Sequence, residues 1–316
     1  MRTLRRHLPW LGAAIALVIV ALLAALAVAW LTAPSIADLP QRVRVLDRSV
    51  GARPVSLHAI APVMREAAVA TEDERYYEHD GIDLLGILRA LPYDLSHVSL
   101  AEGASTIDEQ LAKLVYLGGN DHNPWAKLRD AAIALRIDAS YAKERILRDY
   151  LDTVYLGAGA YGVEAASERY FGLATGQLDL AQAALLAGLI EDPSGAQPYH
   201  HPLAARERQA VALTSMVRTG FATDTEAHRA LVRPLRLDRG RRLPPLRGVS
   251  IIPGPPFHWG ELGLGCGALA LGAAALIALR RRRARLPRLA AIGSRTAGAF
   301  AILAGILLVL GSFRGA

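Results

Sequence analysis

The chain has 316 residues and one cysteine, Cys266, which excludes an internal disulfide and a cysteine-based metal cage. Its length allows one sizeable domain, or two, with a substantial core. The formal net charge of +7 is unevenly distributed, because residues 1–33 and 259–316 are basic whereas residues 34–258 carry a net charge of −3. The basic charge therefore flanks apolar segments, and no nucleic-acid-binding surface is expected.

The first 33 residues predict a membrane anchor. No charged residue occurs between Pro9 and Pro34, a stretch of about 24 residues that is long enough to cross a hydrocarbon layer of ~30 Å. A cleaved signal peptide is the alternative, but its apolar core would have only ~7–15 residues. Arg2, Arg5 and Arg6 predict that the anchor begins in the cytoplasm.

Two further apolar segments lie near the C-terminus, at residues 260–279 and from residue 297 onward. The six arginines of residues 280–288 separate them and predict a cytoplasmic loop. Both ends of the chain then place residues 34–258 outside the cytoplasm, in a multi-pass protein of the bacterial plasma membrane. Seven arginines within residues 229–247 indicate either contact with anionic lipid head groups or a soluble linker.

The segment between these apolar regions has mainly helical patterns, and a short strand is expected only near Val43–Val45. Pro62 suits the first turn of a helix that we expect to stop at Gly81. Thr106 and Glu109 have the spacing of a capping box at the start of the next helix. Further helices are expected to begin at residue 124 and to cover residues 141–155, 161–171, 179–190 and 202–219.

Residues 71–81 (TEDERYYEHDG) contain five carboxylates, at positions 72, 73, 74, 78 and 80. Most runs of charged residues are solvated helix faces, so this stretch alone does not indicate a catalytic site. The segments that follow it change the interpretation.

Five successive motifs resemble those of glycosyltransferase family 51, the peptidoglycan glycosyltransferases. Residues 72–81 resemble the pattern E-D-x-x-F-x-x-H-x-G, and residues 103–113 resemble G-G-S-T-I-T-Q-Q-L-x-K. Residues 127–130 resemble K-x-x-E, and residues 141–172 resemble a longer motif that ends in Y-F-G. Residues 178–220 also follow the family's order. Five motifs in sequence at the usual spacing are a specific match, unlike one short pattern.

This resemblance implies a lysozyme-like helical domain at residues 55–232, in agreement with the mainly α fold that the helical patterns predict. The apolar segments predict that one N-terminal and two C-terminal transmembrane helices anchor this domain; the C-terminal pair is not part of the family pattern. The other expected segments are a tail and transmembrane helix (1–33), a membrane-proximal linker (34–54), a basic stalk (233–258) and a transmembrane hairpin (259–316). The implied enzyme polymerises lipid-linked disaccharide-pentapeptide, lipid II, into glycan strands with inversion and release of lipid pyrophosphate. Its expected partners are lipid II, the growing glycan strand, the membrane and other proteins of cell-wall synthesis.

The resemblance also implies the roles of individual residues. Glu72 corresponds to the catalytic glutamate that accepts a proton from the acceptor hydroxyl, and Asp130 to a second catalytic acid. Asp73 and His79 are expected to shape the site, and nearby carboxylates to raise the pKa of Glu72. The residues expected to bind substrate are Ser105, Thr106, Gln110, Lys113 and Lys127. Helix capping is the alternative role for the first two, and a solvated surface position is the alternative for the lysines. Residues 103–106 open a helix, and the free backbone amides of a helix start predict an anion site for the leaving pyrophosphate there.

Several residues depart from the family pattern. Asp108 and Glu109 replace Thr-Gln, Ala126 replaces an arginine, Asp130 is one methylene shorter than glutamate, and Asp152 replaces an asparagine. A like-charge contact at 4 Å costs ~1 kcal/mol in water and up to ~4 kcal/mol at a partly buried site, so pyrophosphate binding is expected to weaken.

A divalent cation, Mg²⁺ or Mn²⁺, held by Asp130 with help from Asp108 or Glu109 would compensate for these changes. A glycan- or lipid-binding scaffold without full activity, in a cell-envelope complex, is the alternative function. A lysozyme-like hydrolase is a third, which the pyrophosphate motifs disfavour.

Overall fold

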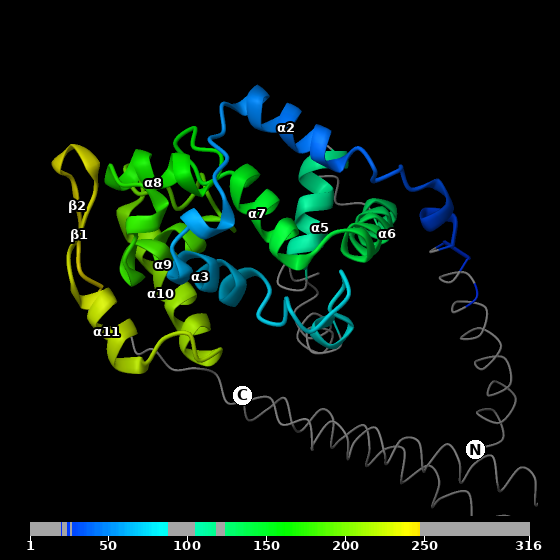
Figure 1. Ribbon diagram of the computed structural model, residues 1–316. Helices are drawn as coiled ribbons and strands as arrows, with labels where there is room; N and C mark the ends of the chain where they lie inside the picture. The colour runs from blue at the N-terminus through cyan, green and yellow to red at the C-terminus, as the bar shows by residue number, and fades with distance from the viewer. Residues whose placement is uncertain (1–19, 21–23, 26, 88–104, 118–123, 247–316) are drawn as a thin grey trace, which may run out of the picture. The chain divides into compact units, whose positions relative to one another are not determined.

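The computed structural model describes residue 20 and residues 24–25, 27–87, 105–117 and 124–246 (Figure 1). All of them belong to one unit of the chain, and the other unit, residues 89–100 and 253–316, lies outside the described residues. The two expected C-terminal membrane spans and most of the N-terminal one therefore also lie outside them. Along the described stretches, no helix has both the length and the apolar character needed to cross a membrane.

The prediction of a mainly α fold is confirmed for the described residues. The helices are α2 (Leu39–Val50), α3 (Pro62–Glu72), α5 (Ile107–Ala112), α6 (Pro124–Ser140), α7 (Lys143–Thr153), α8 (Val163–Phe171), α9 (Leu180–Leu189), α10 (Pro202–Arg218) and α11 (Asp224–Val232). Short elements are the 3₁₀ turns η1 (Leu57–Ala59), η4 (Thr175–Gln177) and η5 (Asp238–Gly240) and the π-helical turn η3 (Lys113–Leu117). Strands β1 (Leu235–Arg236) and β2 (Arg242–Leu243) pair antiparallel.

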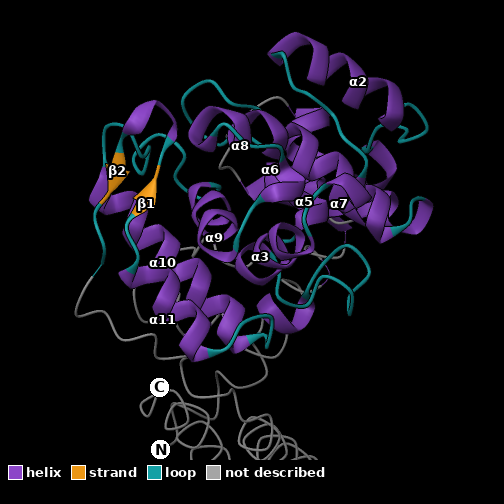
Figure 2. Ribbon diagram, turned by 60° about the vertical axis from the view of Figure 1, so that its left-hand side comes forward, coloured by secondary structure: helices purple, strands orange, loops and turns teal. Residues whose placement is uncertain are grey.

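Helix α9 lies at the centre of the core and packs against α3, α8 and α10 (Figures 1 and 2). Eight of its ten residues are buried, as expected for a helix that is apolar on all sides. At Gly188 a Cβ atom would lie 2.5 Å from the carbonyl oxygen of Arg208, so α9 and α10 approach more closely than any side chain at position 188 would permit. This close packing fixes α3, which carries the acidic stretch, against α9 and α10.

Helix α5 packs against α6 and α7. The capping box predicted at its start is confirmed: the Glu109 amide donates to Thr106 Oγ1 at 3.1 Å, and the Thr106 amide donates to Glu109 Oε2 at 2.9 Å. The Thr106 hydroxyl also donates to the carbonyl of Gly81 at 2.7 Å. These bonds join the start of α5 to the loop that follows α3.

The strand predicted at Val43–Val45 is wrong, because these residues lie within α2. Leu39, Val43 and Asp47 are buried at a spacing of four residues, which is the periodicity of a helix face. Helix α2 packs against α7 and η3. The segment expected as a linker, 34–54, therefore contains a helix of the folded unit.

Helix α3 ends at Glu72, nine residues before the expected stop at Gly81. The carboxylate of Asp73 accepts hydrogen bonds from His79 Nε2 and from the amide of Ile107, which turns the chain away from the helix axis. The β1–β2 hairpin lies in the expected stalk, and its buried Leu235 and Leu243 pack into the same core as α9.

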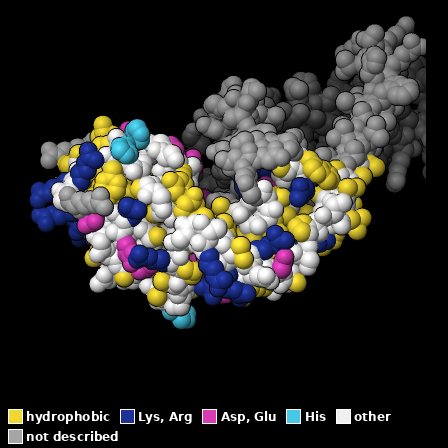
Figure 3. Space-filling model, turned by 90° about the horizontal axis from the view of Figure 1, so that it is seen from above, with side chains coloured by type: hydrophobic (Ala, Val, Ile, Leu, Met, Phe, Trp, Pro, Cys, Tyr) yellow, Lys and Arg dark blue, Asp and Glu magenta, His cyan; other side chains and the backbone are white. Residues whose placement is uncertain are grey.

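The segment before α2 is joined to α6 by one side chain. The guanidinium of Arg136 donates to the backbone carbonyls of Trp30, Ala33 and Pro34, and it lies 4.8 Å from the ring centre of Trp30. Seen from above, apolar side chains gather at the right-hand end of the described residues, among basic ones (Figure 3). The exposed large apolar residues include Val28, Trp30, Leu31 and Trp125.

Candidate active site

Glu72 is the last residue of α3, and it is joined to two other helices by hydrogen bonds. Gln110 Nε2 of α5 donates to Glu72 Oε2 at 2.7 Å. The hydroxyl of Tyr150, a fully buried residue of α7, donates to Gln110 Oε1 at 2.7 Å. Because Tyr150 occupies the amide oxygen, the amide nitrogen of Gln110 faces Glu72. The carboxylate of Glu72 is thus held by a donor whose orientation is itself fixed.

Burial raises the pKa of Glu72 to about 7, although the hydrogen bond from Gln110 and the charge of Arg208 act in the opposite direction. The charge of Asp73 adds to the increase, as expected. Glu74 and Glu78 are not among the causes, since Glu74 pairs with Arg218 and Glu78 with Arg75. A carboxylate that titrates near pH 7 suits a general base at neutral pH.

Asp73 and His79 form a buried pair directly behind Glu72. His79 Nε2 lies 2.9 and 3.0 Å from the two carboxylate oxygens of Asp73, and the amide of Ile107 donates to Asp73 Oδ2 at 3.1 Å. Burial opposes the charged form of His79, but the hydrogen bond and charge of Asp73 outweigh it and raise the pKa of His79. The pair fixes the distance between the end of α3 and the start of α5.

Asp108 and Glu109 do not place two free charges beside the substrate, contrary to the expectation. Asp108 is fully buried, and Lys143 Nζ lies 3.0 Å from its Oδ2 and 2.6 Å from Asp138 Oδ1. Burial raises the pKa of Asp108 to about 6, and Lys143 opposes this. Glu109 is occupied by the capping box. The extra acids of this chain thus serve the fold around α5.

The start of α5 is also a weaker anion site than predicted. The amide of Ile107 is occupied by Asp73, and the amides of Thr106 and Glu109 are occupied within the capping box. Thr106 is buried, and its hydroxyl donates to Gly81. Thr106 therefore caps a helix, which was its alternative role. The N-terminal half of the predicted anion site, residues 103–104, lies outside the described residues.

The predicted substrate-binding cations lie on either side of α5. Lys127 of α6 is exposed, and its Nζ donates to Ser105 Oγ at 2.8 Å. Lys113 is partly buried on η3, and its side chain forms no hydrogen bond or ion pair with the part of the chain that the structure describes, although its backbone amide donates to the carbonyls of Glu109 and Gln110. Ala126, where the family has an arginine, is buried and supplies no charge. The structure therefore brings the Lys127 ammonium together with the Ser105 hydroxyl next to the start of α5.

Asp73, His79 and Asp108 each offer one ligand atom, and these three atoms lie within 4.8 Å of one another, so the group could hold a metal ion. The surroundings do not fit a catalytic metal, because Lys143 already supplies a positive charge to Asp108 and the carboxylate of Asp73 is already bonded to His79 and to the amide of Ile107. A catalytic metal site needs an open coordination position. Asp130, the predicted ligand, is buried on α6 and is not a member of this group.

Sequence reasoning assigned no role to Tyr150 or Arg208. Arg208 of α10 pairs with Glu191, donates to the carbonyl of Gly188 at 3.3 Å, and is the basic residue whose charge lowers the pKa of Glu72. Both residues lie in segments that match the family pattern. Nothing in their spacing, however, indicates that they approach a residue 78 or more positions earlier in the chain.

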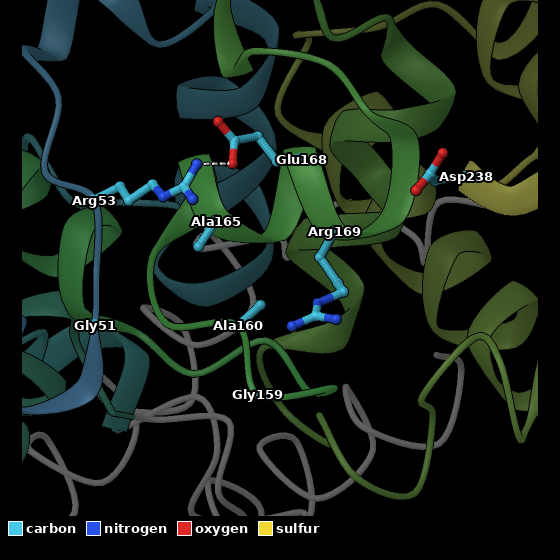
Figure 4. A pocket seen from close by; sticks show the side chains of 8 residues that line it. All are labelled: Gly51, Arg53, Gly159, Ala160, Ala165, Glu168, Arg169 and Asp238. Atoms are coloured by element: carbon cyan, nitrogen blue, oxygen red, sulfur yellow. Dashed lines mark hydrogen bonds and ion pairs between the residues drawn. The ribbon is translucent and has the colours of Figure 1, made fainter.

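A pocket of ≈ 320 Å³ lies away from these residues, between residue 51, the loop at 159–160 and α8 (Figure 4). Arg53 reaches from the segment after α2 to Glu168 of α8 and forms an ion pair across one side of the pocket. Glu72 and the other predicted site residues do not line it. We therefore assign the chemistry to the Glu72 region.

The family model described as transglycosylase matches residues 41–217. A protein of Cupriavidus necator named "putative transglycosylase H16_A0665" is 44% identical over 171 residues, which are 54% of this chain and 73% of that protein. Penicillin-binding protein 1A of Escherichia coli is 40% identical over 173 residues (55% of this chain, 20% of that protein).

Penicillin-binding protein 1A of Aquifex aeolicus is 37% identical over 185 residues (58% of this chain, 25% of that protein). This chain thus spans a quarter or less of the length of these two penicillin-binding proteins. The family match covers more than half of the chain and includes Glu72, Gln110 and the helices that hold them. The chain therefore belongs to the transglycosylase family, the peptidoglycan glycosyltransferases of glycosyltransferase family 51.

Proposed function

We propose that this chain is an active, membrane-anchored peptidoglycan glycosyltransferase that polymerises lipid II into glycan strands. The observation that carries the proposal is the Glu72 carboxylate, which is oriented by Gln110 and has a pKa of about 7. Its helical core agrees with the lysozyme-like architecture that the family resemblance implies. The alternative scaffold function has one observation in its favour, the uncharged and buried Ala126.

In the proposed reaction, Glu72 accepts the proton of the acceptor sugar hydroxyl as the hydroxyl oxygen attacks the anomeric carbon of the growing strand. The bond between that carbon and the pyrophosphate oxygen breaks, and its electron pair leaves with the lipid pyrophosphate. Attack opposite the leaving group inverts the anomeric configuration. A positioned general base contributes typically ~10²–10⁴-fold to such a step.

Lys127, Ser105 and Lys113 are proposed to hold the departing pyrophosphate. The 2.8 Å bond from Lys127 to Ser105 places an ammonium and a hydroxyl together next to the start of α5, which also carries Gln110. Charge-assisted hydrogen bonds to phosphate oxygens are stronger than neutral ones, so the two lysines would stabilise the leaving group more than the Ser105 hydroxyl would.

A divalent cation enters this proposal only at Asp130. We propose that Asp130, whose charge acts on Glu109, would hold Mg²⁺ or Mn²⁺. The cation would neutralise the negative charge of the leaving group, as Mg²⁺ bound by one or two carboxylates and phosphate oxygens does elsewhere.

The anchoring of the enzyme to a bacterial plasma membrane, with the helical domain outside the cytoplasm, is also part of the proposal. It is supported by the apolar residues 11–33, by the exposed Trp30, Leu31 and Trp125, and by the attachment of this segment to α6 through Arg136. Lipid II would then be reached from the membrane surface, and other proteins of cell-wall synthesis would be met there.

Purified full-length protein incubated with labelled lipid II tests the proposal, beside a Glu72→Gln variant. Polymer made by the parent and not by the variant is the expected result. Binding of lipid II without polymer, at any Mg²⁺ or Mn²⁺ concentration, would instead identify the scaffold function. Shortening of added glycan strands would identify a hydrolase.

A further inference from the structure

Three carboxyl groups are buried where α2 lies on α7. Asp47 of α2 and Asp149 and Asp152 of α7 are each no more than 4% exposed. Buried carboxylates are unfavourable unless cations or hydrogen-bond donors compensate for the lost water.

The two nearby arginines, Arg145 and Arg148, pair mainly with Asp149. Arg145 Nε lies 2.8 Å from Asp149 Oδ2, and Arg148 Nε donates to Asp149 Oδ1 at 3.0 Å. The same Arg148 nitrogen lies 4.0 Å from Asp152 Oδ2, so it reaches Asp152 only weakly. Two guanidinium groups therefore face three carboxyl groups, which leaves one negative charge uncompensated if all three are ionised.

Asp47 and Asp152 are the groups left without a full partner. Among the residues that the structure describes, Asp47 Oδ1 is buried and accepts no hydrogen bond. Asp152 Oδ1 accepts one, from the amide of Val55 at 3.1 Å. The other basic residues of α2 near this point, Arg44 and Arg48, are exposed. No side chain on α2 therefore neutralises the cluster from its own helix.

A bound proton removes the electrostatic repulsion between the carboxyl groups of Asp47 and Asp152. Burial raises the pKa of Asp47 to about 6, with Asp149 adding to the increase and Arg148 opposing it. Burial likewise raises the pKa of Asp152 to about 7. The hydrogen bond from the Val55 amide and the charge of Arg148 lower this pKa, whereas the charges of Asp47 and Asp149 raise it further. Geometry and charge count thus agree that the folded cluster binds protons that the unfolded chain releases.

We propose that Asp47 and Asp152 together hold a proton in the folded protein, and that this proton keeps α2 docked on α7. Loss of the proton places two negative charges in one buried interface, and separation of α2 from α7 lets water relieve them. The docking of α2 is therefore proton-dependent and weakens as the pH rises through neutrality.

The consequence reaches the segment that leads to α3. Asp152 holds the amide of Val55, and two residues earlier Arg53 is tied to Glu168 of α8 (Figure 4). Helix α3, which begins at Pro62, ends at Glu72. Asp152 is therefore a positioning residue for the segment that leads into α3, and α2 covers the buried side chain of Asp152. This inference stands without the proposed glycosyltransferase activity.

The sign of the pH dependence follows from the raised pKa values. A carboxyl group whose pKa is higher in the folded state than in the unfolded state stabilises the fold at low pH, and this contribution is lost as the pH rises through the folded-state pKa. The docking of α2 should accordingly be strongest below about pH 5 and weakest above about pH 8. Each unit of pKa difference corresponds to a tenfold change in the opening equilibrium.

Hydrogen–deuterium exchange of the full-length chain at about pH 5.5 and pH 8, corrected for intrinsic exchange rates, tests the proposal. We expect the amides of α2 to lose protection at the higher pH by on the order of tenfold to a hundredfold, while those of α9 do not. Asp47→Asn and Asp152→Asn each keep the side-chain shape and remove one charge, and each should abolish most of the loss.

Asp224→Asn is the control, because Asp224 is exposed on α11, outside the interface between α2 and α7. It should leave the pH dependence unchanged. Equal protection of α2 at both pH values in the parent would overturn the proposal, as would a loss that persists in both asparagine variants. If either variant folds poorly, the other one decides the outcome, and the thermal midpoint as a function of pH provides the second readout.

Discussion

The carboxylate of Asp73 accepts the backbone amide of Ile107 at 3.1 Å, across 34 residues of sequence. This bond sets the first residue of α5 against the residue that follows Glu72. Gln110 lies one turn further along α5, so its amide reaches the Glu72 carboxylate. The position of Glu72, the proposed general base, thus depends on a buried hydrogen bond made by its neighbour Asp73.

Replacing Glu72 with glutamine should abolish polymerisation without unfolding the protein. The amide has nearly the same shape as the carboxylate but cannot accept the hydroxyl proton, so the rate should fall by about 10²–10⁴-fold. Polymer yield from labelled lipid II measures the change, and circular dichroism checks the fold. Unchanged polymerisation would remove Glu72 from the mechanism.

The Gln110→Ala variant should move the pH profile of polymerisation. Gln110 donates to the charged form of Glu72 and so lowers its pKa. Without this bond the pKa of Glu72 rises above about 7, and the acidic limb of kcat should shift to higher pH. Tyr150→Phe is the companion variant, since it removes only the bond to the oxygen of Gln110 and should give a smaller shift in the same direction.

Lys143→Met should destabilise the protein in a pH-dependent way. Removing one partner of a buried ion pair costs ~3–5 kcal/mol, because the remaining charge is left uncompensated. The pKa of Asp108 is about 6, and the charge of Lys143 lowers it. Without Lys143 the pKa of Asp108 rises, so Asp108 takes up a proton more readily in acid and its charge is removed. The decrease in the free energy of unfolding, measured with denaturant, should be larger at pH 8 than at pH 5. Arg236→Met, at an exposed position, is the control.

A chelation experiment distinguishes a metal bound by Asp73, His79 and Asp108 from a metal bound at Asp130. We expect EDTA to lower the rate of polymerisation, with recovery on addition of Mg²⁺ or Mn²⁺, and to leave the thermal midpoint unchanged. The midpoint should not move because Lys143, not a metal, compensates the charge of Asp108. Activity that is indifferent to EDTA would exclude the cation proposed at Asp130, and a lower midpoint would show a structural metal instead.

The parts of the fold that depend on local signals could be predicted from the sequence. Thr106 and Glu109 are three residues apart, and their capping box is visible as a short pattern. Helix α2 was missed because its buried face includes a charged residue, Asp47, which interrupts the apolar periodicity, while the alternation around Val43–Val45 resembles a strand.

The orientation of the extra acids could not be predicted for a different reason. Asp108 turns inward because Lys143, 35 residues later, meets it in the core. Such a partner is invisible to any pattern that spans a few residues. The same holds for Arg208, which reaches Glu72 only because α3 and α10 pack together.

The hydrogen-bond chain from Tyr150 through Gln110 to Glu72 has a consequence for turnover. A glutamine amide is neither an acid nor a base at physiological pH, so it cannot pass a proton inward. In the proposed reaction, each proton that Glu72 accepts must therefore be released from its solvent-exposed side, since Glu72 is partly exposed. Release of the proton to bulk water is then a step of every cycle, and buffer molecules small enough to reach Glu72 should speed it.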